Sequence, residues 1–176
     1  SLCVVLHCSF LHKSHLFINL SPLIIISAIE DIPLDTIKRF ESLLSYNIPI
    51  LIFVNKMDML GANLHDVISE MQSKLSMKVM DFHKAAVDAE DDEFYEELAS
   101  CDESLMEEYL TNGVVDTASI VDGIRQRKLF PVVSGSALRY QGIDSLVNII
   151  QKYMQKKILL VIGMVYPHLI SKQGNH

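Results

Sequence analysis

The segment IPILIFVNKMD, residues 48–58, decides the fold prediction for this chain. Its first seven residues are apolar and rich in β-branched side chains, which predicts a strand that is buried on both faces. The polar residues Asn55, Lys56 and Asp58 follow directly. Strands buried on both faces belong to parallel sheets, and in open parallel sheets ligands bind beyond the carboxyl ends of the strands. The segment therefore predicts a buried strand that ends at a candidate binding site.

Strand and helix patterns alternate in the rest of the chain. Residues 23–29 (LIIISAI) and 130–133 (FPVV) have the same apolar character as residues 50–54. Apolar residues at helical spacing predict helices over residues 34–47, 63–76 and 143–154. This alternation predicts an α/β fold with right-handed βαβ units, in which the three strands are adjacent and parallel and helices flank the sheet. The last helix is predicted to have one apolar face, made of Ile143, Leu146, Val147, Ile150 and Met154.

Composition limits the classes of function. The 176 residues are enough for one domain with a single core. The net charge of −7 repels a phosphate backbone, so no direct nucleic-acid binding is expected from this domain alone. No apolar run near the N-terminus is long enough to span a membrane, and Cys3, Cys8 and Cys101 lack the spacing of metal ligands. We expect a cytoplasmic protein with free thiols, no membrane partner and no metal site.

A second polar tip follows the strand at residues 130–133. Here Ser134, Gly135, Ser136 and Ala137 lead towards the last helix. Polar residues after a strand are often only turn formers, because their side chains bond the local backbone. The order of strand, NKMD, helix, strand and SGSA nevertheless resembles the guanine-recognition motifs of GTP-binding proteins. The sequence leaves two readings open, a guanine site or two structural turns.

The resemblance implies a role for each residue of the two tips. Guanine presents a ring N–H and an amino group side by side, and the Asp58 carboxylate would accept both. Asn55 would orient the loop and reach the other edge of the base, and the Lys56 stem would pack on the ring. In the second tip, the Ala137 N–H would bond the guanine carbonyl oxygen. Ser136 would steady the turn that begins at Ser134, and Gly135 would allow close approach.

Residues 23–154 resemble the GTP-binding domain of translational GTPases of the elongation factor G group, and most closely the tetracycline-resistance ribosomal protection proteins. The residues that carry this resemblance are ILIFVNKMDMLGANL (50–64), DESLMEEYLTNG (102–113) and LFPVVSGSALRYQGIDSLVNII (129–150). The resemblance implies a partial GTP-binding domain at residues 23–156 with an acidic helical insert near residues 78–128. Residues 157–176 would begin a β-barrel, and residues 1–22 match nothing. The implied partners are a guanine nucleotide and, through the parent protein, the ribosome.

Two motifs of this family are missing from the 176 residues. No glycine is followed by lysine, so the phosphate-binding loop G-x-x-x-x-G-K-[ST] is not present. The residues before Leu23 do not match the family's Asp-x-Pro-Gly-His segment either. We therefore expect a P-loop-GTPase-like fold that is truncated on its N-terminal side, with no catalytic residue. GTP or GDP binding would be weak or lost, and the Mg²⁺ of the parent family is not expected here. The alternative is a non-catalytic remnant or interaction domain that binds no nucleotide.

Overall fold

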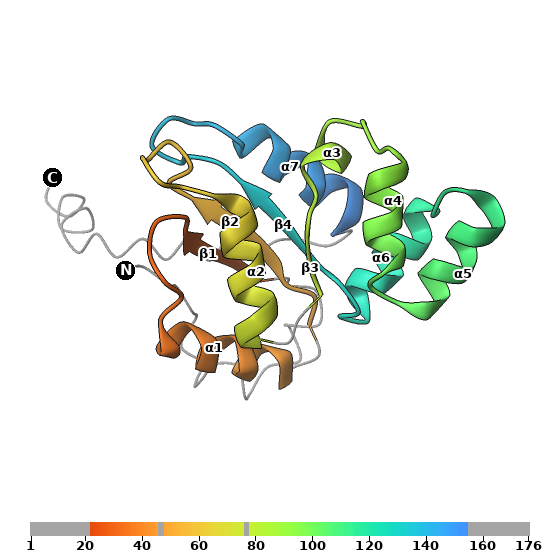
Figure 1. The fold of residues 1–176 in the computed structure, drawn as a ribbon, viewed down its shortest axis with the longest axis horizontal. Coiled ribbons are helices and arrows are strands. Elements are labelled where there is room, and N and C mark those ends of the chain that lie inside the picture. Colours follow the sequence, from red (N-terminus) through yellow and green to blue (C-terminus); the bar gives the residue numbers. More distant parts are fainter. Residues whose placement is uncertain (1–21, 46–47, 76–77, 155–176) are drawn as a thin grey trace, which may run out of the picture.

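The structure is a computed structural model, and it describes residues 22–45, 48–75 and 78–154. The predicted β-barrel start at residues 157–176 lies outside the described residues, as does the unmatched segment at residues 1–22 except for Pro22. Strands and helices alternate along the described part (Figure 1). In chain order they are β1 (Leu23–Ser27), α1 (Leu34–Ser45), β2 (Leu51–Asn55), α2 (Leu64–Leu75), β3 (Val79–Asp81), α3 (His83–Ala86), α4 (Asp92–Ala99), α5 (Glu103–Asn112), α6 (Thr117–Arg125), β4 (Phe130–Ser134) and α7 (Ile143–Tyr153).

The four strands form one parallel sheet in the order β1-β2-β4-β3. The prediction that the three long strands are adjacent and parallel is confirmed. The short edge strand β3 is a difference, because it lies at the start of the region that the sequence analysis assigned to an acidic helical insert. β3 has only three residues, and two of them are Met and Asp. Its sequence therefore shows neither a long apolar run nor a β-branched pattern that would predict a strand. Pairing with β4 is what defines this strand.

Alternate residues along the strands point to opposite faces of the sheet, and each face has its own core, where the sequence analysis expected a single one. Ile24 of β1 and Ile52 of β2 pack with Phe40 of α1 and Met71 of α2 on one face. Leu51 and its neighbours on the other face pack against α3 to α7. Figure 1 shows α1 and α2 on one side of the sheet, with α4 to α6 beyond the β3 edge. The flanking helices of the predicted α/β fold are thus confirmed.

One helix faces its core differently from the prediction. In α7 the buried side chains are Leu146, Ile149 and Tyr153, whereas Val147 is 42% exposed. The predicted face was therefore wrong at Val147 and missed Ile149. A helix with many apolar residues has more than one possible apolar face. The face that packs against the sheet is the one that is buried.

Aspartates in the acidic region begin its helices. Asp91, Asp102 and Asp116 are the N-cap residues of α4, α5 and α6, and each side chain accepts a hydrogen bond from a backbone N–H in the first turn. Such a cap satisfies a donor that has no partner within the helix. The acidic composition thus fixes where these helices start, in addition to solvating their outer faces.

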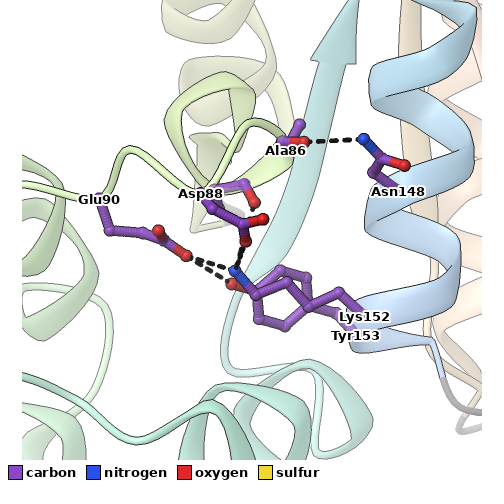
Figure 2. Close-up of polar contacts among 7 residues, drawn as sticks. Ala86, Asp88, Glu90, Asn148, Lys152 and Tyr153 are labelled. Carbon is purple, nitrogen blue, oxygen red and sulfur yellow. Dashed lines mark hydrogen bonds and ion pairs between the residues drawn. The ribbon is translucent and has the colours of Figure 1, made fainter.

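Lys152, near the end of α7, ties the segment between α3 and α4 to the rest of the domain. Its Nζ lies 2.6 Å from Asp88 Oδ1 and 2.7 Å from Glu90 Oε1 (Figure 2). The Tyr153 hydroxyl donates to the same Glu90 oxygen at 3.2 Å. One turn earlier, Asn148 Nδ2 donates to the Ala86 carbonyl at 3.0 Å. These polar contacts therefore hold the connection between α3 and α4 on α7.

Aromatic rings reinforce the same junction. Phe82, which is fully buried between β3 and α3, makes edge-to-face contacts with Phe94 of α4 and Tyr153 of α7. The ring centroids are 5.5 Å and 5.4 Å away, within the range of favourable aromatic pairs. Phe82 therefore joins the sheet edge, the acidic helices and α7 in one core.

We expect Phe82→Ala to lower the free energy of unfolding by about 3–5 kcal/mol, because it removes a buried ring and leaves a cavity between three elements. Urea unfolding followed by circular dichroism measures the change. Leu110→Ala is the control, since Leu110 is 76% exposed and its loss is expected to cost less than about 0.5 kcal/mol. Equal costs for the two variants would contradict the assigned core.

A second prediction concerns alkaline pH. Burial raises the pKa of Tyr153 from 10.0 to about 12. Burial lowers the pKa of Lys152, but hydrogen bonds to Asp88 and Glu90 outweigh it and raise that pKa above 10.5. In both cases the folded state holds its proton more tightly than the unfolded state. The stabilisation is complete below the unfolded pKa values and is lost as the pH rises through the folded ones.

The free energy of unfolding is therefore expected to fall above pH 10. Tyr153→Phe keeps the ring and removes the ionisable hydroxyl, so its slope between pH 10 and pH 12 is expected to be shallower than that of the wild type. The difference is at most about 1.4 kcal/mol per pH unit for one proton. Urea titrations at several pH values measure it, and identical slopes would contradict the assignment.

Candidate functional site

The loops that follow β2 and β4 meet at the carboxyl edge of the sheet. The parallel register pairs Val54 with Ser134, so the two strands end side by side. Asn55 Oδ1 accepts a hydrogen bond from the Ala137 N–H at 2.9 Å. The backbone adds a bond from Met57 N to the Gly135 carbonyl at 3.0 Å. Hydrogen bonds thus link the first tip directly to the second.

Lys56 turns the first loop sharply. Its φ of 69° lies in the left-handed region, which is uncommon for a residue with a side chain and is often found at functional sites. The Lys56 ammonium lies 2.7 Å from Glu30 Oε1, in the loop that follows β1. This bond is the first cause of a lowered pKa for Glu30. A third strand end therefore takes part in the same site.

Asp58 is a covered carboxylate with two polar neighbours. Arg139 Nε lies 2.9 Å from Asp58 Oδ2, and the Asp58 side chain is 10% exposed. The Ser136 hydroxyl first, and the Arg139 guanidinium next, lower the pKa of Asp58 below its usual value of 3.8. The carboxylate is therefore ionised at neutral pH. It offers hydrogen-bond acceptors and carries a negative charge at the junction of the two loops.

Two glycines allow the second loop to fold back on itself. Ser136 and Gln141 exchange backbone hydrogen bonds of 3.0 Å in each direction. A Cβ on Gly135 would lie 2.1 Å from the Gln141 carbonyl oxygen, and one on Gly142 would lie 2.2 Å from the Ser134 carbonyl oxygen. Side chains at these positions are therefore excluded by the backbone itself. The loop can hold Ser136, which is 1% exposed, beside Asp58 only in this tight form.

All seven residues singled out from the sequence lie at this edge of the sheet. They are Asn55, Lys56, Asp58, Ser134, Gly135, Ser136 and Ala137. Their contacts differ from the expected ones in two respects. The Ala137 N–H donates to Asn55, and the Lys56 ammonium pairs with Glu30. The Ala137 N–H, which the sequence analysis directed at the guanine carbonyl oxygen, thus bonds to the protein in this structure, and so does the Lys56 ammonium.

Sequence reasoning missed two residues of the site. Glu30 lies three residues beyond the end of β1, at the same sheet edge as the other strand ends. Arg139 lies two residues beyond Ala137, in the loop that completes the second tip. The position after a parallel strand was the available signal for Glu30. No pattern in the sequence pairs Arg139 with a carboxylate that lies 81 positions earlier.

The chemistry of the site fits a planar ligand with neighbouring N–H donors. The ionised Asp58 carboxylate accepts such donors, and the left-handed turn at Lys56 leads into it. The Ser27 hydroxyl at the end of β1 is buried and has no hydrogen-bond partner in the described part of the chain.

Within residues 22–45, 48–75 and 78–154, no three His, Cys, Asp or Glu side chains are grouped to hold a metal ion. In those ranges there is also no helix with the length and apolar character to cross a membrane.

Comparisons with known proteins agree with this fold. The family described as the elongation factor Tu GTP binding domain matches residues 21–156. The chain belongs to this family. Its fold is the α/β, P-loop-GTPase-like sheet with flanking helices described above. Similar solved structures include a protein of Thermus thermophilus, with a TM-score of 0.58 and 17% identity over 74% of this chain and 26% of that one. At this identity the likeness shows the fold alone.

Curated relatives with similar sequences are tetracycline resistance proteins. The protein TetP of Clostridium perfringens is 31% identical over an alignment of 149 positions, which covers 74% of this chain and 23% of the relative. TetS of Listeria monocytogenes is 29% identical over 139 residues, covering 73% of this chain and 22% of the relative. The chain thus spans less than a quarter of the length of these relatives. The GTP-binding domain of translational GTPases is the part that they share with it.

The backbone constraint at Gly142 gives a test of the site. Gly142→Ala is expected to lower the free energy of unfolding by about 3 kcal/mol or more, because a φ of 76° and the close Ser134 carbonyl both oppose a Cβ. Gly61→Ala is the matched control, since Gly61 has a φ of 87° and open space around it. Its cost is expected to be about 1–2 kcal/mol, from backbone strain alone. Urea unfolding measures both, and an equal cost would contradict the close packing of the second loop.

Proposed function

We propose that this chain binds the base of guanine nucleotides through the site at the β2 and β4 ends. The observation that supports this most directly is the ionised Asp58 carboxylate, held at the junction of two loops that Asn55 and Ala137 join. Guanine offers a ring N–H and an amino group that one carboxylate can accept together. Adenine has no such donor pair and would leave the carboxylate without these hydrogen bonds, which disfavours adenine.

The other residues of the site have supporting roles in this proposal. Asn55 fixes the second loop, and its amide would reach the other edge of the base. The Lys56 stem would lie along the ring, with Glu30 holding the ammonium. Ser134, Gly135 and Ser136 shape the second tip, and the Ala137 N–H would turn from Asn55 to the guanine carbonyl oxygen. Each role follows from the family resemblance and from the position of the residue at this sheet edge.

The proposal extends to the parent protein. Membership of the family and the similarity to tetracycline resistance proteins support a ribosome-acting translational GTPase of the ribosomal protection type. In it, residues 23–156 would be the partial GTP-binding domain, with the acidic helical insert near residues 78–128 and a β-barrel beginning at residues 157–176. The ribosome would be a partner of the parent protein in the cytoplasm. Mg²⁺ would act only with the phosphate-binding loop, which residues 1–176 do not contain.

Without that loop, only contacts to the base and ribose remain in this chain. Guanosine, GDP and GTP are therefore expected to bind with similar affinities, near a Kd of about 1 mM, or about −4 kcal/mol. The second candidate function is a remnant or interaction domain that binds no nucleotide. It is favoured by the contacts within the site, because Asp58 and the Ala137 N–H are both bonded to protein groups. Base selectivity distinguishes the two candidates.

We expect the wild type to bind guanosine in preference to adenosine and xanthosine. Asp58→Asn is expected to weaken guanosine binding by about ten-fold or more, because it removes a charged acceptor, and to shift the preference towards xanthosine. The exocyclic carbonyl of xanthine can accept from the new amide, whereas it would repel a carboxylate. Ligand-observed NMR titrations with the three nucleosides measure these preferences.

Asp66→Asn is the matched control, because it makes the same chemical change at an exposed position in the first turn of α2. It is expected to leave all three affinities unchanged. An equal response of the wild type and Asp58→Asn to the three nucleosides, or no response, would contradict guanine recognition. The two tips would then be turns at the ends of strands, and the second candidate would stand.

A further inference from the structure

The guanidinium of Arg139 bonds the carboxylate that the proposed function assigns to guanine. Arg139 Nε donates to Asp58 Oδ2 at 2.9 Å. A guanidinium carries several N–H donors in one plane, arranged to match a carboxylate. The edge of guanine with the ring N–H and the amino group is itself a guanidine unit with neighbouring, coplanar donors. Arg139 and guanine therefore present the same chemical group to Asp58.

The two partners differ in how firmly they are held. The Asp58 side chain is 10% exposed and has the buried Ser136 beside it, whereas the Arg139 side chain is 64% exposed. Leu138 and Tyr140, on either side of Arg139, are also exposed, at 86% and 83%. The guanidinium can thus move into water by rotation about side-chain bonds, and water will solvate it fully. The carboxylate stays in place, because the loop that carries it is bonded to the second tip.

We propose that Arg139 is an intramolecular competitor of guanine, which covers Asp58 in the free protein and leaves it when the base binds. This inference rests on the proposed function and adds a residue that sets the affinity of the same site. Guanine replaces the donors that it displaces. Adenine must displace the same guanidinium, so the competition lowers the affinity for both bases, and the choice between them rests on the donors that guanine returns to Asp58.

Ionic strength distinguishes this competitor from an ordinary surface contact. Guanosine carries no net charge, so salt does not directly screen its attraction to Asp58. Salt does screen the attraction between Arg139 and Asp58, because Arg139 is largely exposed. Guanosine affinity of the wild type is therefore expected to rise with salt concentration. Without Arg139 this rise is expected to disappear.

The test compares the wild-type chain with Arg139→Gln in NMR titrations with guanosine and adenosine, from about 0.02 M to about 0.5 M sodium chloride. At low salt, Arg139→Gln is expected to bind guanosine about two- to five-fold more tightly, as expected for release from one exposed ion pair. Adenosine binding is expected to rise by no more than the same factor, so the preference for guanosine stays unchanged. Arg125→Gln is the matched control, since it removes the same charge from an exposed ion pair on α6, and it is expected to behave as the wild type.

A second measurement does not depend on any nucleoside. The Asp58 carboxyl carbon is titrated by NMR in both proteins, and Arg139→Gln is expected to raise the pKa of Asp58 while Ser136 still keeps it below 3.8. An unchanged pKa would show that the ion pair does not form and would overturn the inference alone. Equal guanosine affinity in the wild type and Arg139→Gln would also overturn it and leave the proposed function intact. Guanosine binding by Arg139→Gln but not by the wild type would support both, and binding by neither would overturn both.

Discussion

The parallel register between β2 and β4 is the constraint on which the rest of the domain depends. It pairs Val54 with Ser134, so two strands that are far apart in the chain end at the same height. The bond between the Asn55 amide oxygen and the Ala137 N–H can form only in that register. A slip by one residue would also turn the apolar side chains of each strand to the opposite face. The packing of the sheet and the geometry of the site are therefore fixed by the same alignment.

The acidic helical region is joined to the sheet by contacts that involve none of the residues of this site. Phe82 connects the edge strand to α4 and α7 through two aromatic contacts, and Lys152 bonds two carboxylates in the connection that follows α3. The residues that stabilise this junction are thus different from the polar residues of the candidate site. A change in stability at Phe82 and a change in ligand selectivity at Asp58 can therefore be measured independently.

The candidate site combines fixed and movable groups. The backbone of the second loop has no freedom at Gly135 and Gly142, because any Cβ would meet a carbonyl oxygen. In contrast, the charged partners of Asp58 and Lys56 are partly exposed. Arg139 pairs with Asp58, and Glu30 pairs with Lys56. A rigid backbone with exchangeable ion pairs favours a ligand that can replace the lost hydrogen bonds. Guanine, the proposed ligand, would satisfy this requirement at Asp58, and the chain belongs to a family of GTP-binding domains.

The sequence by itself determined the α/β class and the residues of the two tips. Apolar strand runs that end in polar residues, such as Asn55 and Asp58, are local features, and a parallel sheet brings such ends to one edge by necessity. The sequence did not reveal β3, since a three-residue edge strand exists only through its pairing with β4. It also did not show that Arg139 bonds Asp58 or that Glu30 bonds Lys56. These pairs join residues from different loops, and side chains so far apart in the chain meet only after the tertiary fold has placed their loops together.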